Sequence, residues 1–118
     1  EDTDLCKRLK KLNKKLFILG NIKVHHLFGT SVDQKYKSEL YLVRDWHLYW
    51  SSFYYHRKHY GFFASFRIHF SKLVRFFFMK TLYSFKNNKN LHNLYKARLG
   101  GLINQIFNKS AFSGFIFK

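Results

Sequence analysis

Residues 62–86 read FFASFRIHFSKLVRFFFMKTLYSFK, and this stretch decides the fold class. Its apolar residues recur every three or four positions, which is the spacing of one face of an α-helix. The apolar stripe of the expected helix consists of Phe62, Phe66, Phe70, Leu73 and Phe77. Basic residues interrupt every apolar run, and each run is far shorter than the roughly 20 residues that a membrane span needs. The stretch therefore predicts an amphipathic helix that does not cross a membrane.

The pattern is also helical before this stretch. We expect a helix that reaches from about Asp33 to Tyr60, with Ser31 or Asp33 as its N-cap. Gly61 follows directly and is expected to interrupt the helix.

A third helix is expected from Leu91 to about Asn108, with Asn90 as its N-cap. Gly100 and Gly101 lie inside it, and a glycine in a helix costs roughly 1 kcal/mol relative to alanine. The glycine pair therefore predicts either close packing against another element or a bend.

The first part of the chain predicts a short amphipathic helix from about Thr3 to Asn13. Its apolar face consists of Leu5, Leu9 and Leu12. Gly20-Asn21 signals a turn, and apolar and polar residues alternate after it, as they do in a half-buried strand. We therefore expect a short pair of β-segments near residues 16–26.

The 118 residues include 22 Lys or Arg and 6 Asp or Glu, which gives a formal net charge of +16. Such a charge indicates an anionic partner, which could be nucleic acid, an acidic membrane surface or a phosphorylated substrate. The single cysteine, Cys6, excludes an internal disulfide framework. Because the sequence starts with Glu1 and not with Met, we expect it to be a piece of a longer protein or a trimmed product.

Three of the six acidic residues lie in the opening stretch Glu1-Asp2-Thr3-Asp4. Carboxylates bind divalent metals through oxygen and take protons from hydroxyl groups, so the cluster is a candidate catalytic site. The same residues also suit the N-terminal cap of a helix, where the macrodipole stabilises negative charge. Both interpretations stay open.

His25 and His26 form a second candidate site, because neutral histidine is the commonest metal ligand. Neighbouring residues of a strand point to opposite faces, so one metal would use only one of the two. The alternative is a histidine that is merely hydrogen-bonded at the end of a strand.

Aromatic and basic residues interleave from Tyr41 to Phe85. This mixture suits base stacking with phosphate contacts, a lipid headgroup interface, or a helical bundle with an aromatic core. The sequence pattern alone leaves these three interpretations open.

The order of these pieces resembles the C-terminal portion of family 2 glycosyltransferases, in particular the rhamnosyltransferase-like bacterial branch. Residues 1–9, EDTDLCKRL, are similar to the family motif E-D-x-D-L-C-x-R-L, and residues 26–31, HLFGTS, match H-x-x-G-x-S. Residues 40–45, LYLVRD, resemble a tyrosine-rich stretch that ends in Arg-Asn, with Asp45 in place of the Asn. Residues 97–102, ARLGGL, are similar to a closing helix that bears glycines.

The resemblance implies an inverting sugar transfer in which Asp2 is the general base that deprotonates the acceptor hydroxyl. Glu1 and Asp4 would then shape the acceptor pocket. His26, with His25 as the fallback, would hold a Mg²⁺ or Mn²⁺ ion that stabilises the departing diphosphate. The implied partners are a nucleotide-diphosphate sugar and a lipid-linked or saccharide acceptor.

The basic aromatic helices beyond Asp33 are expected to dock on an anionic membrane surface. This implies a cytoplasmic protein that is peripheral on the inner face of the cell membrane. The candidate membrane-contacting residues are Arg57, Lys58, Arg67, Lys72, Arg75 and Lys80.

The expected fold is mainly α with the β-segment pair. Residues 1–32 would end a GT-A-type α/β catalytic domain, and residues 33–118 would form a basic aromatic helical region. The expected function is that of the C-terminal fragment of a glycosyltransferase in cell-surface polysaccharide synthesis. Without the nucleotide-binding half, these residues alone are not expected to catalyse the transfer.

Two alternatives come from other classes of protein. The first is a small basic helical protein that binds nucleic acid. The acidic opening stretch argues against it because carboxylates repel phosphate, so nucleic acid is not an expected partner. The second is a membrane-surface amphipathic protein without catalysis, which leaves His26 and Gly29 unexplained.

Overall fold

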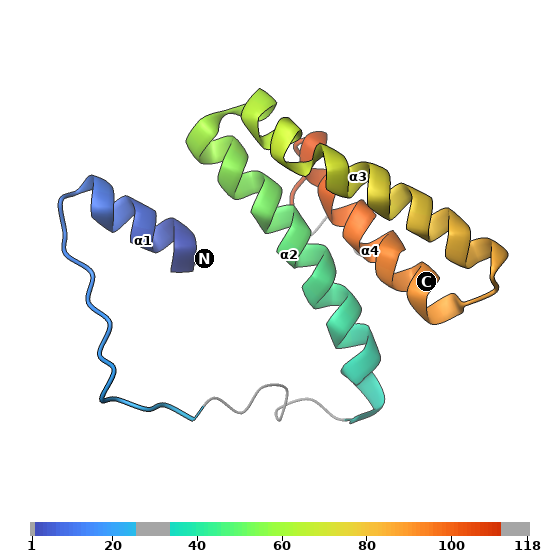
Figure 1. Cartoon of the computed structure of the whole chain (residues 1–118), viewed down its shortest axis with the longest axis horizontal. Helices are drawn as coiled ribbons and strands as arrows, with labels where there is room; N and C mark the ends of the chain where they lie inside the picture. Colours follow the sequence, from blue (N-terminus) through green and yellow to red (C-terminus); the bar gives the residue numbers. More distant parts are fainter. Residues whose placement is uncertain (1, 26–33, 112–118) are drawn as a thin grey trace. The chain divides into compact units, whose positions relative to one another are not determined.

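The computed structural model describes residues 2–25 and 34–111. These residues form four α-helices and a 3₁₀-helix (Figure 1). In chain order they are α1 (Asp2–Lys11), η1 (Gln34–Tyr36), α2 (Lys37–Tyr60), α3 (Phe62–Phe85) and α4 (Lys89–Ile106). The chain divides into two compact units, which are residues 1–31 and residues 32–118.

The N-terminal unit consists of α1 and the coil that follows it. The helix ends close to Asn13, whose backbone lies in the left-handed region (φ 55°) that commonly terminates helices. The coil of residues 14–25 turns at Gly20-Asn21, where the Ile22 N–H donates to the Leu19 carbonyl at 3.4 Å. No residue of α1 is buried, so this unit has no core around its helix.

The predicted pair of β-segments near residues 16–26 is wrong, because residues 16–25 are coil and the described part of the chain contains no strand. The predicted turn forms, but Ile22 and Val24 are 60% and 82% exposed, so this segment buries no apolar face. An isolated two-stranded hairpin is marginal in water, which explains why alternation alone does not produce strands here. The GT-A-type α/β fold is also wrong, since residues 2–25 and 34–111 contain helices and coil only.

The C-terminal unit is a bundle of α2, α3 and α4. Gly61 separates α2 from α3 and has a left-handed backbone (φ 87°), which glycine adopts without a steric penalty. The predicted interruption at Gly61 is therefore confirmed. The N-caps predicted for α2, Ser31 and Asp33, lie outside the described residues.

Helix α4 begins after Asn88, not after Asn90. The side-chain oxygen of Asn88 accepts a hydrogen bond from the Leu91 N–H at 3.1 Å, which satisfies one of the free donors of the first turn. The preceding residue, Asn87, has a left-handed backbone (φ 54°) and makes the sharp turn that brings α4 back along α3. The predicted N-cap at Asn90 is therefore wrong: the cap is Asn88, an asparagine two positions earlier.

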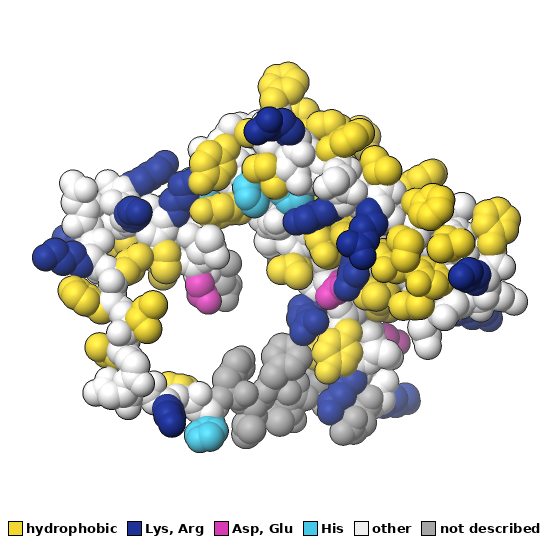
Figure 2. All heavy atoms as spheres, in the orientation of Figure 1, with side chains coloured by type: hydrophobic (Ala, Val, Ile, Leu, Met, Phe, Trp, Pro, Cys, Tyr) yellow, Lys and Arg dark blue, Asp and Glu magenta, His cyan; other side chains and the backbone are white. Residues whose placement is uncertain are grey.

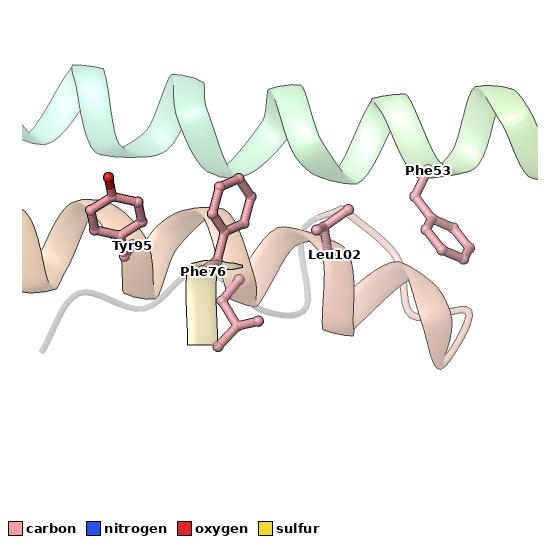
Figure 3. Close-up of a cluster of buried hydrophobic side chains, with 5 residues drawn as sticks. Phe53, Phe76, Tyr95 and Leu102 are labelled. Carbon is pink, nitrogen blue, oxygen red and sulfur yellow. The ribbon is translucent and has the colours of Figure 1, made fainter. Parts of the chain in front are cut away.

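One aromatic and aliphatic cluster holds the three helices together. Its buried members are Phe53 of α2, Phe76 of α3, and Tyr95, Leu99 and Leu102 of α4 (Figure 3). The Phe53 and Leu102 side chains are both 0% exposed. Complete burial of one such side chain contributes about 1.5–3 kcal/mol, so this small cluster is the main source of stability in the bundle.

Helices α2 and α4 approach each other closely at Gly101. A Cβ atom on Gly101 would overlap the Trp46 backbone carbonyl and lie 3.1 Å from the Trp50 nitrogen. The close packing predicted from the glycine pair is therefore confirmed. None of the helices in the described residues combines the length and the apolar character that crossing a bilayer requires.

Candidate functional site

The predicted catalytic carboxylates lie in the first turn of α1. Asp2 is exposed, and the Asp4 carboxylate forms an ion pair with the Arg8 Nε, at 3.0 Å and one turn further along the helix. Acidic residues in a first turn and a basic partner four positions later both stabilise a helix. The geometry therefore fits the capping interpretation, while the predicted role of Asp2 as a general base stays a prediction.

The predicted metal ligand His26 and the predicted acceptor-pocket residue Glu1 cannot be compared with the structure. Glu1 and His26 are outside the described residues, and the fallback His25 is exposed in the coil after α1. Within residues 2–25 and 34–111, no three His, Cys, Asp or Glu side chains come together as metal ligands would. The predicted Mg²⁺ or Mn²⁺ site has no support from the described part of the chain.

The predicted membrane-contacting residues divide into two groups. Arg57 is half-buried: its Nη1 donates to the Gln105 carbonyl at 3.3 Å and its guanidinium lies 5.6 Å from the Phe62 ring centre. Lys80 is also half-buried. The exposed members are Lys58, Arg67, Lys72 and Arg75, and the last three lie on α3.

Helix α3 presents a second apolar face to solvent. We call this face the outer stripe, and its members are Phe63, Phe66, Phe70, Val74 and Phe77. The spacing of three or four residues places them along one side of the helix. Their exposed fractions range from 36% for Phe66 to 86% for Phe63. Figure 2 shows hydrophobic side chains gathered along α3, with Lys and Arg side chains among them.

The opposite face of α3 packs on the bundle and includes polar residues. His69 is 0% exposed, and its Nε2 lies 2.9 Å from the Ser52 hydroxyl while its Nδ1 lies 2.9 Å from the Ser65 carbonyl. A neutral ring that donates from Nδ1 and accepts at Nε2 satisfies both contacts. Desolvation by burial lowers the pKa of His69 below its ordinary value, which favours this neutral form.

The pair of Ser52 and His69 resembles a nucleophile beside its base, but its surroundings indicate a structural role. The ring is completely enclosed, and both of its nitrogens have partners: Nε2 contacts Ser52 of α2, and Nδ1 contacts the Ser65 carbonyl one turn earlier in α3. The Ser65 hydroxyl in turn donates to the Phe53 carbonyl at 2.9 Å. These hydrogen bonds allow polar side chains to occupy the inner face of α3, which leaves the phenylalanines on the outside.

A partly buried ion pair joins α2 to α4. The Arg98 Nε donates to the Asp45 carboxylate at 2.7 Å, and Asp45 is only 6% exposed. The guanidinium also lies 5.5 Å from the Tyr95 ring centre and 5.9 Å from those of Tyr49 and Phe76. Asp45 was singled out by the family resemblance, but the contacts made here are structural.

Charge is distributed very unevenly along the bundle. Asp45 is the last acidic residue of the sequence, and twelve Lys or Arg follow it. Helices α3 and α4 therefore contain cations and no carboxylates. The surface that carries the outer stripe is basic as well as apolar.

The sequence pattern predicts the apolar spacing of α3 but does not say which side faces solvent. Of the predicted stripe, Phe66, Phe70 and Phe77 are exposed, whereas Leu73 packs against the buried cluster. A signal was present in the sequence: apolar residues occupy more positions of α3 than one helix face holds.

No protein-family model matches this chain, and no curated protein or solved structure was found that is similar to it. The resemblance to glycosyltransferases therefore stays a prediction.

Proposed function

We propose that the C-terminal unit is a peripheral membrane-docking module that lays α3 on an anionic lipid surface. The observation that carries this proposal is the outer stripe, an exposed row of four phenylalanines and a valine bordered by basic residues. One apolar side of α3 packs on the bundle, so the other needs a second apolar environment in which to be buried. A bilayer interface offers that surrounding together with negative charge.

The positions of the cations support a lipid surface over nucleic acid. Arg67 and Arg75 are exposed on α3 next to the outer stripe, and no carboxylate of α3 or α4 opposes them. A nucleic-acid groove would be lined by cations along its middle, with aromatic rings free to stack on bases. In α3 the outer stripe is a continuous apolar row, and Arg67 and Arg75 both lie on one side of it. This order matches acyl chains below and headgroups beside the helix.

The expected contribution of the stripe can be worked out from exposure. Phe70 and Phe77 are 54% and 62% exposed, so moving both into lipid provides about 2–3 kcal/mol. Replacing both should weaken binding about 30- to 100-fold. Arg67 and Arg75 should each add about 1 kcal/mol on an anionic surface and nothing on a neutral one.

The test is co-sedimentation of the full chain with vesicles of phosphatidylcholine containing one third phosphatidylglycerol. Phe70→Gln/Phe77→Gln should lose affinity at every salt concentration, whereas Arg67→Gln/Arg75→Gln should mainly lose the salt dependence. Leu48→Gln/Ile103→Gln is the matched control, because both side chains are exposed apolar residues on other helices. Equal loss in the control, or tighter binding to an RNA oligomer than to vesicles at the same salt, would contradict the proposal.

Glycosyl transfer, implied by the resemblance, is a separate proposal that the docking module neither requires nor opposes. A membrane-docked α3 would bring a transferase to a lipid-linked acceptor. Its direct test is Asp2→Asn in a protein that also carries a sugar-nucleotide site: transfer should fall by orders of magnitude while donor binding persists. Unchanged turnover would remove Asp2 as the base.

A further inference from the structure

The N-terminal unit carries an apolar surface that its own fold leaves uncovered. Within α1, Leu5 is 47% exposed, and Leu12 beyond its end is 68% exposed. Leu5, Leu9 and Leu12 follow the i, i+4, i+7 spacing of one helix face. Helices of this length are marginal in water on their own, so a ten-residue α1 without buried residues needs a surface to pack on.

The coil after α1 extends this apolar surface. Phe17 is 79% exposed, Ile18 99% and Leu19 62%. Together with the leucines of α1 they make a second apolar region, in a unit separate from the bundle. Patches of this kind on an otherwise charged segment mark an interaction site.

The charges of the same segment indicate what covers the apolar surface. Residues 2–25 include seven Lys or Arg and two acidic residues, and one of these acids, Asp4, is paired with Arg8. Lys7, Lys10 and Lys11 lie off the leucine face of α1. A cationic helix with one apolar face, followed by an exposed aromatic and aliphatic run, is complementary to an anionic bilayer interface.

We infer that α1 and residues 16–19 form a second membrane anchor, which binds the same anionic surface as the outer stripe of α3. The inference rests on the proposed function only for the identity of that surface, because it uses different residues in a different unit. Two anchors on one chain make the second binding event intramolecular, so the pair binds more tightly than either alone. A nucleic acid would satisfy the lysines but leave the aliphatic side chains of Leu5, Ile18 and Leu19 in water.

The lone cysteine provides a direct readout. Cys6 is exposed and lies beside Leu5 in α1, so an environment-sensitive fluorophore can be attached to the full chain at this position. On vesicles with one third phosphatidylglycerol, we expect the emission to shift to the blue and the label to become shielded from aqueous iodide. Neither change should occur with an RNA oligomer at equal occupancy.

Three variants separate the two anchors. Leu5→Gln/Leu9→Gln/Leu12→Gln should reduce vesicle affinity about tenfold or more and leave the label in water. Phe70→Gln/Phe77→Gln should weaken binding, but at saturating lipid the Cys6 label should still enter the membrane. Leu48→Gln/Ile103→Gln should change neither readout.

The two proposals fail in different ways. A label that stays in water on vesicles that the chain saturates would overturn the second anchor and leave the α3 proposal intact. Vesicle binding that depends on the α1 leucines but not on Phe70 and Phe77 would overturn the α3 proposal and leave the second anchor intact. Shielding of the label by the RNA oligomer alone would overturn the second anchor in favour of nucleic-acid binding.

Discussion

The contact between Gly101 and α2 gives the sharpest test of the bundle. Alanine at this position places a Cβ against the Trp46 carbonyl and 3.1 Å from the Trp50 nitrogen. Both are backbone atoms within a helix, so the two helices must separate to make room. Overpacking costs about 1–3 kcal/mol, and because the atoms in the way are backbone we expect the upper part of this range, about 2–3 kcal/mol. Alanine returns roughly 1 kcal/mol because it favours the helix more than glycine does.

The expected net loss for Gly101→Ala is about 1–2 kcal/mol, which corresponds to a fall in melting temperature of about 4–16 °C for a domain of this size. Gly100→Ala is the matched control one residue away. Its Cβ would meet the Trp46 indole at 3.2 Å, and a side chain can shift by a few tenths of an ångström. Moving the indole offsets part of the roughly 1 kcal/mol that alanine gains over glycine in a helix, so the control should be unchanged or up to about 1 kcal/mol more stable.

Circular dichroism at 222 nm during urea and thermal unfolding measures both variants on the full chain. If Gly101→Ala is as stable as Gly100→Ala, α4 does not lie against the backbone of α2 as described. An equal loss of stability in both variants would show that neither position tolerates a Cβ atom. It would contradict the argument that the Trp46 indole can move aside while the α2 backbone cannot.

Three further predictions concern polar contacts of the bundle. Asp45→Asn leaves Arg98 without its anionic partner in a largely buried site, and the free energy of unfolding from urea titrations should fall by about 2 kcal/mol; no change would show that the pair does not form. Because the pKa of His69 is lowered in the folded state, the unfolded chain takes up this proton first as the pH falls below about 6.5. The contribution of His69 to the free energy of unfolding should therefore be constant above that pH and decline below it. Urea titrations across pH 5–8 should show a smaller decline for His69→Gln, and an identical pH profile would contradict the argument. Asn88→Ala should cost about 1 kcal/mol in thermal unfolding, whereas Asn90→Ala should be close to neutral; the reverse order would place the cap where the sequence first suggested.

The helices of the C-terminal unit were predictable because their signals are local. Apolar spacing gave a helix from Phe62 to Lys86, and the structure has Phe62–Phe85. Gly61 marked the break between helices because a left-handed backbone suits glycine. Local signals were less exact at Asn88 and Asn90, where two residues of one type compete for a single capping position.

The remaining features depend on partners distant in the sequence. Alternation around Ile22 would produce a strand only beside a sheet, and the described residues provide none. The outward position of Phe70 depends on His69 and Ser65 being accepted inside, which requires the Ser52 hydroxyl and the Phe53 carbonyl from α2. The sequence of α3 alone does not reveal hydrogen bonds to α2, so the spacing of its apolar residues could not distinguish the packed face from the exposed one.

The orientation of α3 on a membrane can be measured directly with single-cysteine variants of the full chain. In a Cys6→Ser background, spin labels are placed in turn at Phe63, Phe70 and Phe77 of the outer stripe, and at Lys72 and Arg75, which are exposed on other sides of the helix. On anionic vesicles, we predict that the three stripe labels become accessible to oxygen dissolved in the lipid, while the other two stay accessible to a water-soluble nickel chelate. Equal accessibility at all five positions would contradict the proposal that α3 docks by its exposed phenylalanines.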